Sequence, residues 1–339
     1  MKKIILSIVA IIAIAIIAVG IYAYPLAFSK CDKSSMVYIY PEMNNLALAD
    51  SLKTRFGDEF SANTITVLDL LDVDISKRVG AYKIAEGTSP YKAARLLQRG
   101  AQTSIRFSFN HVRTVEQFAE RVSQRLLMSK EDLLSLLTDA EFCKKYDKKP
   151  ETIVSIFQPD TYDFFWTVTP QDFVDKMFRY YNNFWNDERL AKAKTLGFTP
   201  DEVVTIGSIV EEEIAKRDEA GKVARLYINR VRKGMLLQAD PTVKFALGDF
   251  KLRRIWGYML QTDSPYNTYV YKGLPPGPIR FVEKRTIDAV LDAPAHPYIY
   301  MCAKEDFSGY HNFTASWEEH KNNARRYQRE LNRRGIKKY

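Results

Sequence analysis

In the segment IGSIVEEEIAKRDE (206–219), three consecutive glutamates directly follow the apolar run IGSIV. In a helix, at about 100° per residue, Val203, Ile206 and Val210 share one sector because they follow the +3/+4 rule. Glu213 continues that series, whereas the other two glutamates flank it. An apolar environment disfavours the charged form of a carboxyl and raises its pKa. A glutamate that stays protonated near neutral pH can act as a general acid in glycoside cleavage.

A second interpretation of the same segment stays open. Arg217 follows Glu213 by four residues, and an i,i+4 ion pair between them would stabilise the helix modestly. A cation at this distance would favour the charged form of the glutamate and lower its pKa. The spacing alone does not separate a general acid from such an ion pair.

Polar and aromatic residues follow in the predicted loops downstream. LQADP (237–241) supplies an amide and a carboxylate, and YNTY (266–269) supplies two phenols, an amide and a hydroxyl. Ligand pockets combine apolar walls with a few placed polar groups. In GLPPGPI (273–279) the prolines restrict the backbone, and Gly273 and Gly277 are available for unusual dihedrals. Each segment alone also fits a structural turn, but their grouping after one apolar-face glutamate predicts a cleft.

Other site chemistries find no support in the sequence. The histidines have no zinc-ligand spacing; they are His111, His296, His311 and His320. The G-x-S-x-G, G-x-G-x-x-G and Walker A patterns are also missing. We therefore expect no metal and no cofactor, and we expect His311 and His320 to pack or to form hydrogen bonds.

The elements that must position these residues are mainly helical. Amphipathic patterns predict helices within 114–149 and one long helix over 169–197. Two further helices are expected within 198–235, the first with Thr199 as N-cap before a proline. Beyond Gly234 the sequence is typical of turns and loops.

The segment that precedes these helices predicts a small αβ module. A strand is expected over 35–43, a helix over 44–57 and another strand over 103–109. Between them, 81–100 reads as a strand, a turn and a helix that starts at Ser89. This unit resembles LysM-like modules, which bind sugar polymers. Many unrelated αβ appendages share the pattern, so contact with glycan stays open.

Length and composition indicate a globular protein of two modest domains, or of one domain with an appendage. The 339 residues are 46% hydrophobic and 27% charged, and 50 Lys and Arg against 41 Asp and Glu give a net charge of +9. Much of the excess is in the C-terminal tail, and no nucleic-acid-reading motif accompanies it. We expect no nucleic-acid partner, whereas a polyanionic wall or an anionic membrane surface stays open.

The N-terminus carries a predicted membrane anchor. Residues 4–24 form an uninterrupted apolar run, long enough at about 1.5 Å per residue to span a bilayer core of roughly 30 Å. The run is longer than the apolar region of a cleaved signal peptide, and no A-x-A-like site follows it. Lys30 replaces the small residue that lipoprotein processing at Cys31 would need. We expect an uncleaved signal anchor.

The orientation of this anchor is less strongly indicated. Lys2 and Lys3 favour a cytoplasmic N-terminus, although Lys30 and Lys33 lie on the other flank. The odd number of cysteines argues against a full disulfide framework; they are Cys31, Cys143 and Cys302. The expected topology is a single-pass protein of the inner (cytoplasmic) membrane with its C-terminal part on the outer, periplasmic side.

Taken together, several motifs resemble the YceG-like family of membrane-bound endolytic murein transglycosylases, and the resemblance covers nearly the whole chain. They are SIVEEE, KVARLYINRVRKGMLLQADPTVKFALG, SPYNTY, GLPPGPI, FQPDTY, EGTS and HNFT…EEH. The resemblance implies a lytic cut of the MurNAc–GlcNAc β-1,4 bond within peptidoglycan strands. It identifies Glu213, the last acid of its motif, as the catalytic residue. Glu213 would act first as general acid and then as general base, forming 1,6-anhydro-MurNAc without consuming water.

The resemblance also identifies residues expected to line the substrate cleft; they are Gln238, Asp240, Tyr266, Asn267 and Tyr269. Glu219 and Asn229 match family positions too, and for both we expect structural hydrogen bonding. The chain departs from the family pattern at three places. Ile214 replaces a common threonine, RFVEK (280–284) replaces an Asn-Pro-Gly, and Arg217 replaces a small residue. The last departure matters most, because Arg217 would weaken the acid if it paired with Glu213.

The predicted fold class is α+β, with a transmembrane helix, a LysM-like αβ module and a lysozyme-like catalytic domain. The expected boundaries are 1–30 for the anchor, 31–110 for the module, 111–198 for a helical connection and 199–339 for the catalytic domain with a basic C-terminal helix. Two alternative functions stay open. One is a peptidoglycan hydrolase using Glu213 and Asp240; the other is a non-catalytic wall-binding membrane protein. Wall-synthesis enzymes are possible partners, since the family trims nascent strands.

Overall fold

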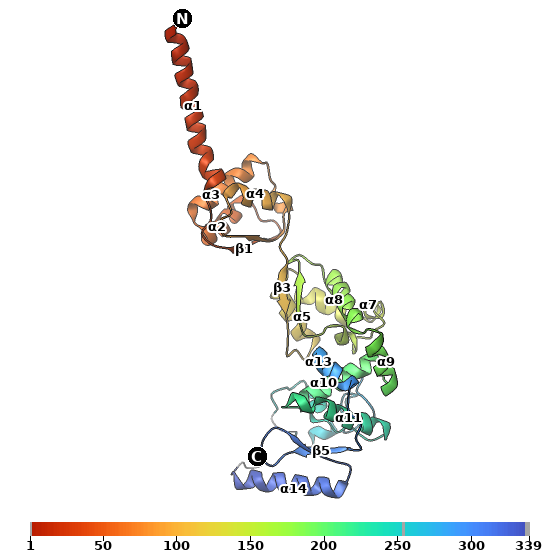
Figure 1. The fold of residues 1–339 in the computed structure, drawn as a ribbon. Helices are drawn as coiled ribbons and strands as arrows, with labels where there is room; N and C mark the ends of the chain where they lie inside the picture. Colours follow the sequence, from red (N-terminus) through yellow and green to blue (C-terminus); the bar gives the residue numbers. More distant parts are fainter. Residues whose placement is uncertain (1, 253–254, 336–339) are drawn as a thin grey trace. The chain divides into compact units, whose positions relative to one another are not determined.

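The computed structural model describes residues 2–252 and 255–335 (Figure 1). The chain divides into two compact units. The first comprises Met1–Phe107, Arg125–Leu127 and Tyr162–Val168. The second comprises Ser108–Gln124, Met128–Thr161 and Thr169–Tyr339.

The first unit begins with the long apolar helix α1 (Lys2–Phe28). At about 1.5 Å per residue its 27 residues extend roughly 40 Å. Its side chains are exposed until Leu26, which is buried in the hydrophobic core of the unit. Within the described part of the chain, α1 is the one helix long and apolar enough to cross a membrane, as either an anchor or a signal would be.

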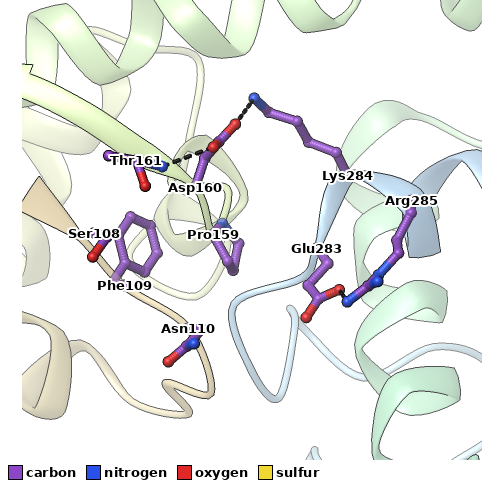
Figure 2. A pocket seen from close by; sticks show the side chains of 9 residues that line it. All are labelled: Ser108, Phe109, Asn110, Pro159, Asp160, Thr161, Glu283, Lys284 and Arg285. Atoms are coloured by element: carbon purple, nitrogen blue, oxygen red, sulfur yellow. Dashed lines mark hydrogen bonds and ion pairs between the residues drawn. The ribbon is translucent and has the colours of Figure 1, made fainter.

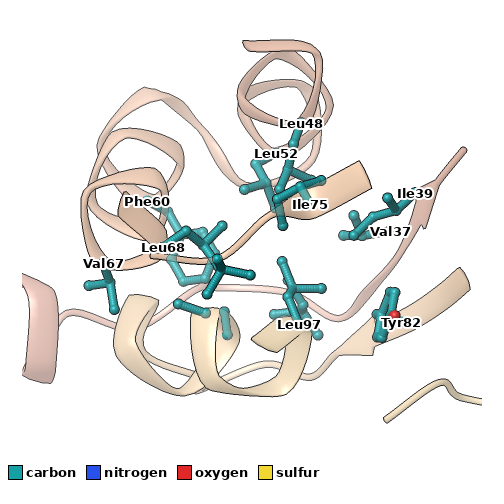
Figure 3. Close-up of a cluster of buried hydrophobic side chains, with 14 of the residues drawn as sticks. Val37, Ile39, Leu48, Leu52, Phe60, Val67, Leu68, Ile75, Tyr82 and Leu97 are labelled. Carbon is teal, nitrogen blue, oxygen red and sulfur yellow. The ribbon is translucent and has the colours of Figure 1, made fainter. Parts of the chain in front are cut away.

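The rest of the first unit packs three helices with a two-stranded sheet. Strands β1 (Ser35–Ile39) and β2 (Gly80–Ile84) pair antiparallel, with Ser35 opposite Ile84. The helices are α2 (Asn45–Phe56), α3 (Asp58–Leu70) and α4 (Pro90–Arg99). Figure 3 shows side chains from all of these elements pointing into one core, among them Leu48, Leu68 and Leu97.

The predicted start and end of α4 are confirmed. Ser89 accepts a hydrogen bond from the backbone N–H of Lys92, and Gly100 takes a left-handed conformation after the last turn. Helix α3 was not predicted, because its sequence FSANTITVLDL is rich in β-branched residues with low helix propensity. Packing of Phe60, Val67 and Leu68 into the core overrides that preference.

A second two-stranded sheet joins β3 (Ile105–Ser108) to β4 (Thr161–Phe164). The helices of the second unit begin with α5 (Val115–Ser123), α6 (Lys130–Thr138), α7 (Ala140–Lys144), α8 (Pro170–Phe184) and α9 (Asp187–Leu196). The prediction of one long helix over 169–197 is wrong, since α8 ends at Phe184. Asn186 then caps α9 by accepting a hydrogen bond from the N–H of Arg189.

The C-terminal half of the second unit adds helices and a hairpin. Its elements are α10 (Pro200–Glu213), α11 (Ala220–Arg232), α12 (Asp240–Leu247), α13 (Lys284–Leu291), β5 (Tyr300–Ala303), β6 (His311–Thr314) and α14 (Trp317–Arg333). Strands β5 and β6 pair antiparallel. The expectation of turns and loops beyond Gly234 is therefore wrong for α12, α13 and the hairpin. The basic C-terminal helix and the mostly helical α+β class are confirmed.

Candidate active site

The candidate site lies at the C-terminal end of α10. This helix starts with a complete capping box between Thr199 and Glu202. It contacts α9, α11, α12 and α13, and every residue from Val203 to Val210 is buried. The sequence predicted one apolar face on this helix, but neighbouring helices bury its residues on all sides from Val203 to Val210. The last turn of the helix borders open space, since Glu211 and Glu213 each line a cavity.

Two of the three glutamates that end α10 are bound by arginines. Arg280 Nη2 lies 3.2 Å from Glu211 Oε1, and its Nη1 lies 2.8 Å from Glu212 Oε1. Arg113 adds a bidentate contact to Glu212, at 2.9 and 3.0 Å. These ion pairs fix the end of the helix and keep the charges of both glutamates compensated.

Glu213 has a different environment. Its Oε1 accepts a hydrogen bond from the hydroxyl of Tyr227 on α11, at 3.1 Å. Burial raises the pKa of Glu213 from its ordinary 4.5 to about 7; the Tyr227 hydrogen bond opposes this effect and the nearby charge of Asp240 adds to it. A carboxyl in this range is available in both protonation states near neutral pH.

Arg217 does not act on this carboxyl. Helix α10 ends at Glu213, so the i,i+4 geometry that would join the two side chains does not form. Arg217 instead begins a short 3₁₀ turn, Arg217–Glu219. Within residues 2–252 and 255–335, no ion pair links it to Glu213, and the ion-pair interpretation of the segment is wrong.

Glu213 opens into a cavity of about 250 Å³. Three of the residues predicted to bind substrate line the same cavity, namely Gln238, Asp240 and Tyr269. The Tyr269 hydroxyl donates to Asp240 Oδ1 at 2.6 Å, and burial raises the pKa of Tyr269. The cavity thus joins one carboxyl of raised pKa to an amide, a second carboxyl and two phenols, counting Tyr227.

The other two predicted substrate residues lie outside the lining of this cavity. Asn267 is fully buried, and its amide donates to the carbonyl oxygens of Leu260 and Thr262. Tyr266 packs against Phe245 with ring centroids 4.7 Å apart, and burial raises its pKa to about 12. Both residues hold the loop that presents Tyr269.

This loop is joined to the turn before α12 by a hydrogen-bond ladder. The N–H of Gln238 donates to the carbonyl of Thr268 at 3.1 Å, and the N–H of Ala239 donates to its hydroxyl at 3.0 Å. The hydroxyls of Thr242 and Thr268 lie 2.8 Å apart. Gln238 itself has a φ of +50°, which few residues other than glycine adopt. These contacts bring two segments about thirty residues apart to one cavity wall.

Sequence reasoning missed two residues of α11 that shape the cavity. Tyr227 is 2% exposed and Arg230 is 8% exposed. Arg230 donates to the carbonyl oxygens of Leu237 and Ile299, at 2.8 and 2.6 Å. An i,i+3 pair of tyrosine and arginine is visible in ARLYINRVR, but the sequence does not indicate that their partners lie on other segments.

The structural roles expected for Glu219 and Asn229 are confirmed. Glu219 accepts hydrogen bonds from the N–H of His311 and lies 2.9 Å from its Nδ1. The Asn229 amide donates to the carbonyls of His296 and Tyr298, at 2.7 and 3.0 Å. Glu219 thus ties the turn before α11 to strand β6, and Asn229 ties α11 to the segment that leads into β5.

The GLPPGPI loop is hydrogen-bonded to helix α10. The N–H of Ile279 donates to the Ser208 hydroxyl of α10 at 3.0 Å. Gly273 has the predicted unusual dihedral, with φ at +85°. Gly277 is required for a different reason, because a Cβ there would lie 1.9 Å from the carbonyl oxygen of Glu151.

A larger and more open cavity of about 540 Å³ lies elsewhere in the second unit (Figure 2). Its charged residues are already paired, Lys284 with Asp160 and Arg285 with Glu283. It holds none of the candidate residues, so volume alone does not identify the site. Among the described residues, no group of three or more His, Cys, Asp or Glu side chains is arranged to hold a metal ion.

Fold and site together define an α+β protein with an N-terminal apolar helix and one carboxyl of raised pKa in a polar cavity. The chain belongs to the YceG-like family, whose model matches residues 37–326. It is 28% identical over 260 residues to the endolytic murein transglycosylase of Bacillus subtilis, covering 72% of this chain and 68% of that protein.

Two further comparisons agree. An endolytic murein transglycosylase of Streptococcus pneumoniae is 30% identical over 114 residues, which cover 32% of this chain and 21% of that protein. The crystal structure of a YceG-like protein from Listeria monocytogenes matches with a TM-score of 0.57 and 25% identity, over 86% of this chain and 98% of the other.

Proposed function

We propose that this protein is an endolytic lytic transglycosylase that cleaves the MurNAc–GlcNAc β-1,4 bond inside peptidoglycan strands. The observation that carries the proposal is the environment of Glu213: a carboxyl of pKa about 7, without an arginine or lysine in its hydrogen-bonding shell among the described residues. The names of the relatives support the choice of substrate.

In the proposed reaction Glu213 acts twice. Protonated, it donates its proton to the glycosidic oxygen as the bond to C1 breaks, and the GlcNAc hydroxyl leaves. Ionised, it then takes the proton of the C6 hydroxyl of MurNAc while that oxygen bonds to C1. The enzyme ends in its starting protonation state, the product carries 1,6-anhydro-MurNAc, and no water is consumed. A pKa near 7 suits both steps.

The neighbours of Glu213 have distinct proposed roles. Tyr227 stabilises the carboxylate between the two steps by donating its hydrogen bond. Gln238, Asp240 and Tyr269 bind sugar hydroxyls in the cavity, and Tyr266 and Asn267 act by shaping the loop that carries Tyr269.

The remaining parts fit a protein held at the wall side of the membrane. Residues 1–30 would anchor the chain in the inner membrane, with the rest on the outer side. Residues 31–110 would form a LysM-like module, since two helices connect two antiparallel strands there. Residues 111–198 would connect it to a lysozyme-like catalytic domain over 199–339. Such an anchor favours nascent strands close to the membrane as substrates and wall-synthesis enzymes as neighbours.

A hydrolase is the second candidate function, favoured by the presence of the Asp240 carboxyl in the same cavity. In that reaction Glu213 would be the acid and Asp240 the base or nucleophile. The products differ: a hydrolase leaves reducing MurNAc ends, each heavier than an anhydro end by one water.

The test is mass analysis of fragments released from purified peptidoglycan by the full chain in detergent. We expect anhydro ends from the wild type and none from Glu213→Gln. Glu131→Gln, at an exposed position on α6, is the matched control and should cleave normally. Reducing ends that disappear in Asp240→Asn would favour the hydrolase. Undiminished cleavage by Glu213→Gln would refute both mechanisms.

A further inference from the structure

A third cavity, of about 310 Å³, lies beside the end of α10. Arg217, Arg280 and Arg285 line it, together with small side chains that include Ala215 and Ala220. It shares no lining residue with the cavity of Glu213. We call it the arginine cavity.

The charges in the arginine cavity do not cancel. Arg280 is bound by Glu211 and Glu212, and Arg285 by Glu283. For Arg217, which is exposed, no carboxylate partner exists among residues 2–252 and 255–335. The cavity therefore keeps one uncompensated guanidinium beside a patch of small apolar side chains. A guanidinium binds carboxylates in a bidentate manner, and the apolar patch suits short aliphatic side chains.

The position of the arginine cavity relative to Glu213 limits what can occupy it. Glu211 lines the arginine cavity and Glu213 lines the other one. Two residues apart on a helix, they point about 200° apart, so the cavities lie on opposite sides of an element roughly 10–12 Å in diameter. A bound glycan strand at Glu213 could reach the arginine cavity only through a substituent about that long.

We propose that the arginine cavity binds a carboxylate of the peptide stem carried by the MurNAc residue at the cleavage site. The inference rests on the proposed function. Stem peptides contain small residues and free carboxylates and end in a carboxylate. An extended peptide spans about 3.3–3.6 Å per residue, so a stem of at least four residues is needed to pass the end of a helix roughly 10–12 Å in diameter. Arg217, which departs from the family pattern at this position, then serves as a specificity residue rather than as a partner of Glu213.

The test compares two substrates, glycan strands with intact stems and the same strands stripped of stems by an amidase. For the full chain in detergent, Arg217→Ala should slow cleavage of stem-bearing strands about fivefold, as expected for one exposed ion pair. It should leave cleavage of stripped strands unchanged. Arg217→Lys should keep only part of the preference, because lysine supplies the charge without the bidentate geometry, and added salt should weaken the preference. Arg179→Ala, an exposed position on α8, is the control and should change neither rate.

A binding measurement separates this inference from the proposed function. In the Glu213→Gln background, stem-bearing strands should bind more tightly than stripped strands, and Arg217→Ala should remove the difference. If the wild type cleaves neither substrate, the proposed reaction fails, but this binding difference still decides the role of Arg217. Equal effects of Arg217→Ala on both substrates, in rate or in binding, would overturn the inference.

Discussion

The hydrogen bond between Tyr227 and Glu213 gives the most direct test of the proposed acid. Replacing Tyr227 by phenylalanine removes one hydroxyl and keeps the ring in its buried position. Because the hydroxyl donates to the carboxylate at 3.1 Å, it lowers the pKa of Glu213, against the larger opposing effect of burial. The variant should therefore raise this pKa further.

The size of the effect follows from the strength of the bond. Hydrogen bonds to charged groups contribute about 1.5–3 kcal/mol, and a length of 3.1 Å places this one at the weak end. With about 1.36 kcal/mol per pKa unit, the pKa of Glu213 should rise by about one. In the proposed reaction cleavage requires protonated Glu213, so the alkaline limb of the pH profile should move upward by about one pH unit. At neutral pH a larger fraction of Glu213 is then protonated for the acid step, whereas less of it is ionised for the base step.

The assay measures initial rates of anhydro-end formation from pH 5 to pH 9 for the wild type and Tyr227→Phe. Tyr258→Phe serves as the control, because Tyr258 is 73% exposed, and its profile should match the wild type. An alkaline limb that stays in place, or moves to lower pH, would mean that Glu213 is not the titrating acid or that Tyr227 does not donate to it during catalysis.

Three further predictions concern stability. Glu213→Gln should raise the melting temperature at pH 8 and leave it unchanged at pH 4. The pKa of Glu213 is about 7 in the folded state against an ordinary 4.5. Ionisation of Glu213 therefore destabilises the folded state as the pH rises above 4.5, by up to about 3 kcal/mol. Equal changes in melting temperature at both pH values would contradict this. Arg280→Ala leaves the largely buried Glu211 without its arginine, whereas Glu212 keeps Arg113. The loss should approach the roughly 3–5 kcal/mol of a broken buried ion pair, measured by denaturant unfolding beside Arg179→Ala. A loss below about 1 kcal/mol would show that the Arg280 ion pairs are unimportant for stability. Gly277→Ala should also destabilise the folded state, because the added Cβ would overlap the carbonyl of Glu151. Overpacking of this kind costs about 1–3 kcal/mol or more. An unchanged unfolding midpoint would contradict the close approach of the two backbone segments.

The features that the sequence predicts well are those set by neighbours in the chain. The caps at Ser89 and Thr199 depend on residues three positions away, and the structure confirms both. The break between α8 and α9 has a local signal as well, since Asn186 is followed by two acids. The amphipathic pattern nevertheless continues across Asn186, because α8 and α9 each bury one apolar face, and it therefore favours a single helix.

The candidate site was predictable only in part, because most of its contacts are long-range. The motif that contains Glu213 indicates an acid, but its hydrogen-bond donor lies on another helix, fourteen residues away. Arg280 is 68 residues from the glutamate it binds most closely. Similarly, Asn267 lies in a motif that suggests substrate contact, yet its side-chain amide donates hydrogen bonds to backbone carbonyls of its own loop. Spacing does not encode such partners; packing determines them.

The three glutamates at the end of α10 illustrate how packing divides one sequence motif into different roles. An arginine paired with Glu213 would lower the pKa of this carboxyl from about 7. Burial would still oppose the cation, as it does at Glu211, whose pKa burial raises despite the contact with Arg280. Each unit by which the pKa fell would reduce the protonated fraction at pH 7, and with it the rate of an acid-catalysed step, by up to about tenfold. The structure instead assigns Arg113 and Arg280 to the two flanking glutamates and ends the helix before Arg217 can turn toward the third. The ion pairs of Glu211 and Glu212 hold the helix end, and the carboxyl of Glu213, whose hydrogen-bond partner is Tyr227 rather than an arginine, keeps the raised pKa that burial gives it.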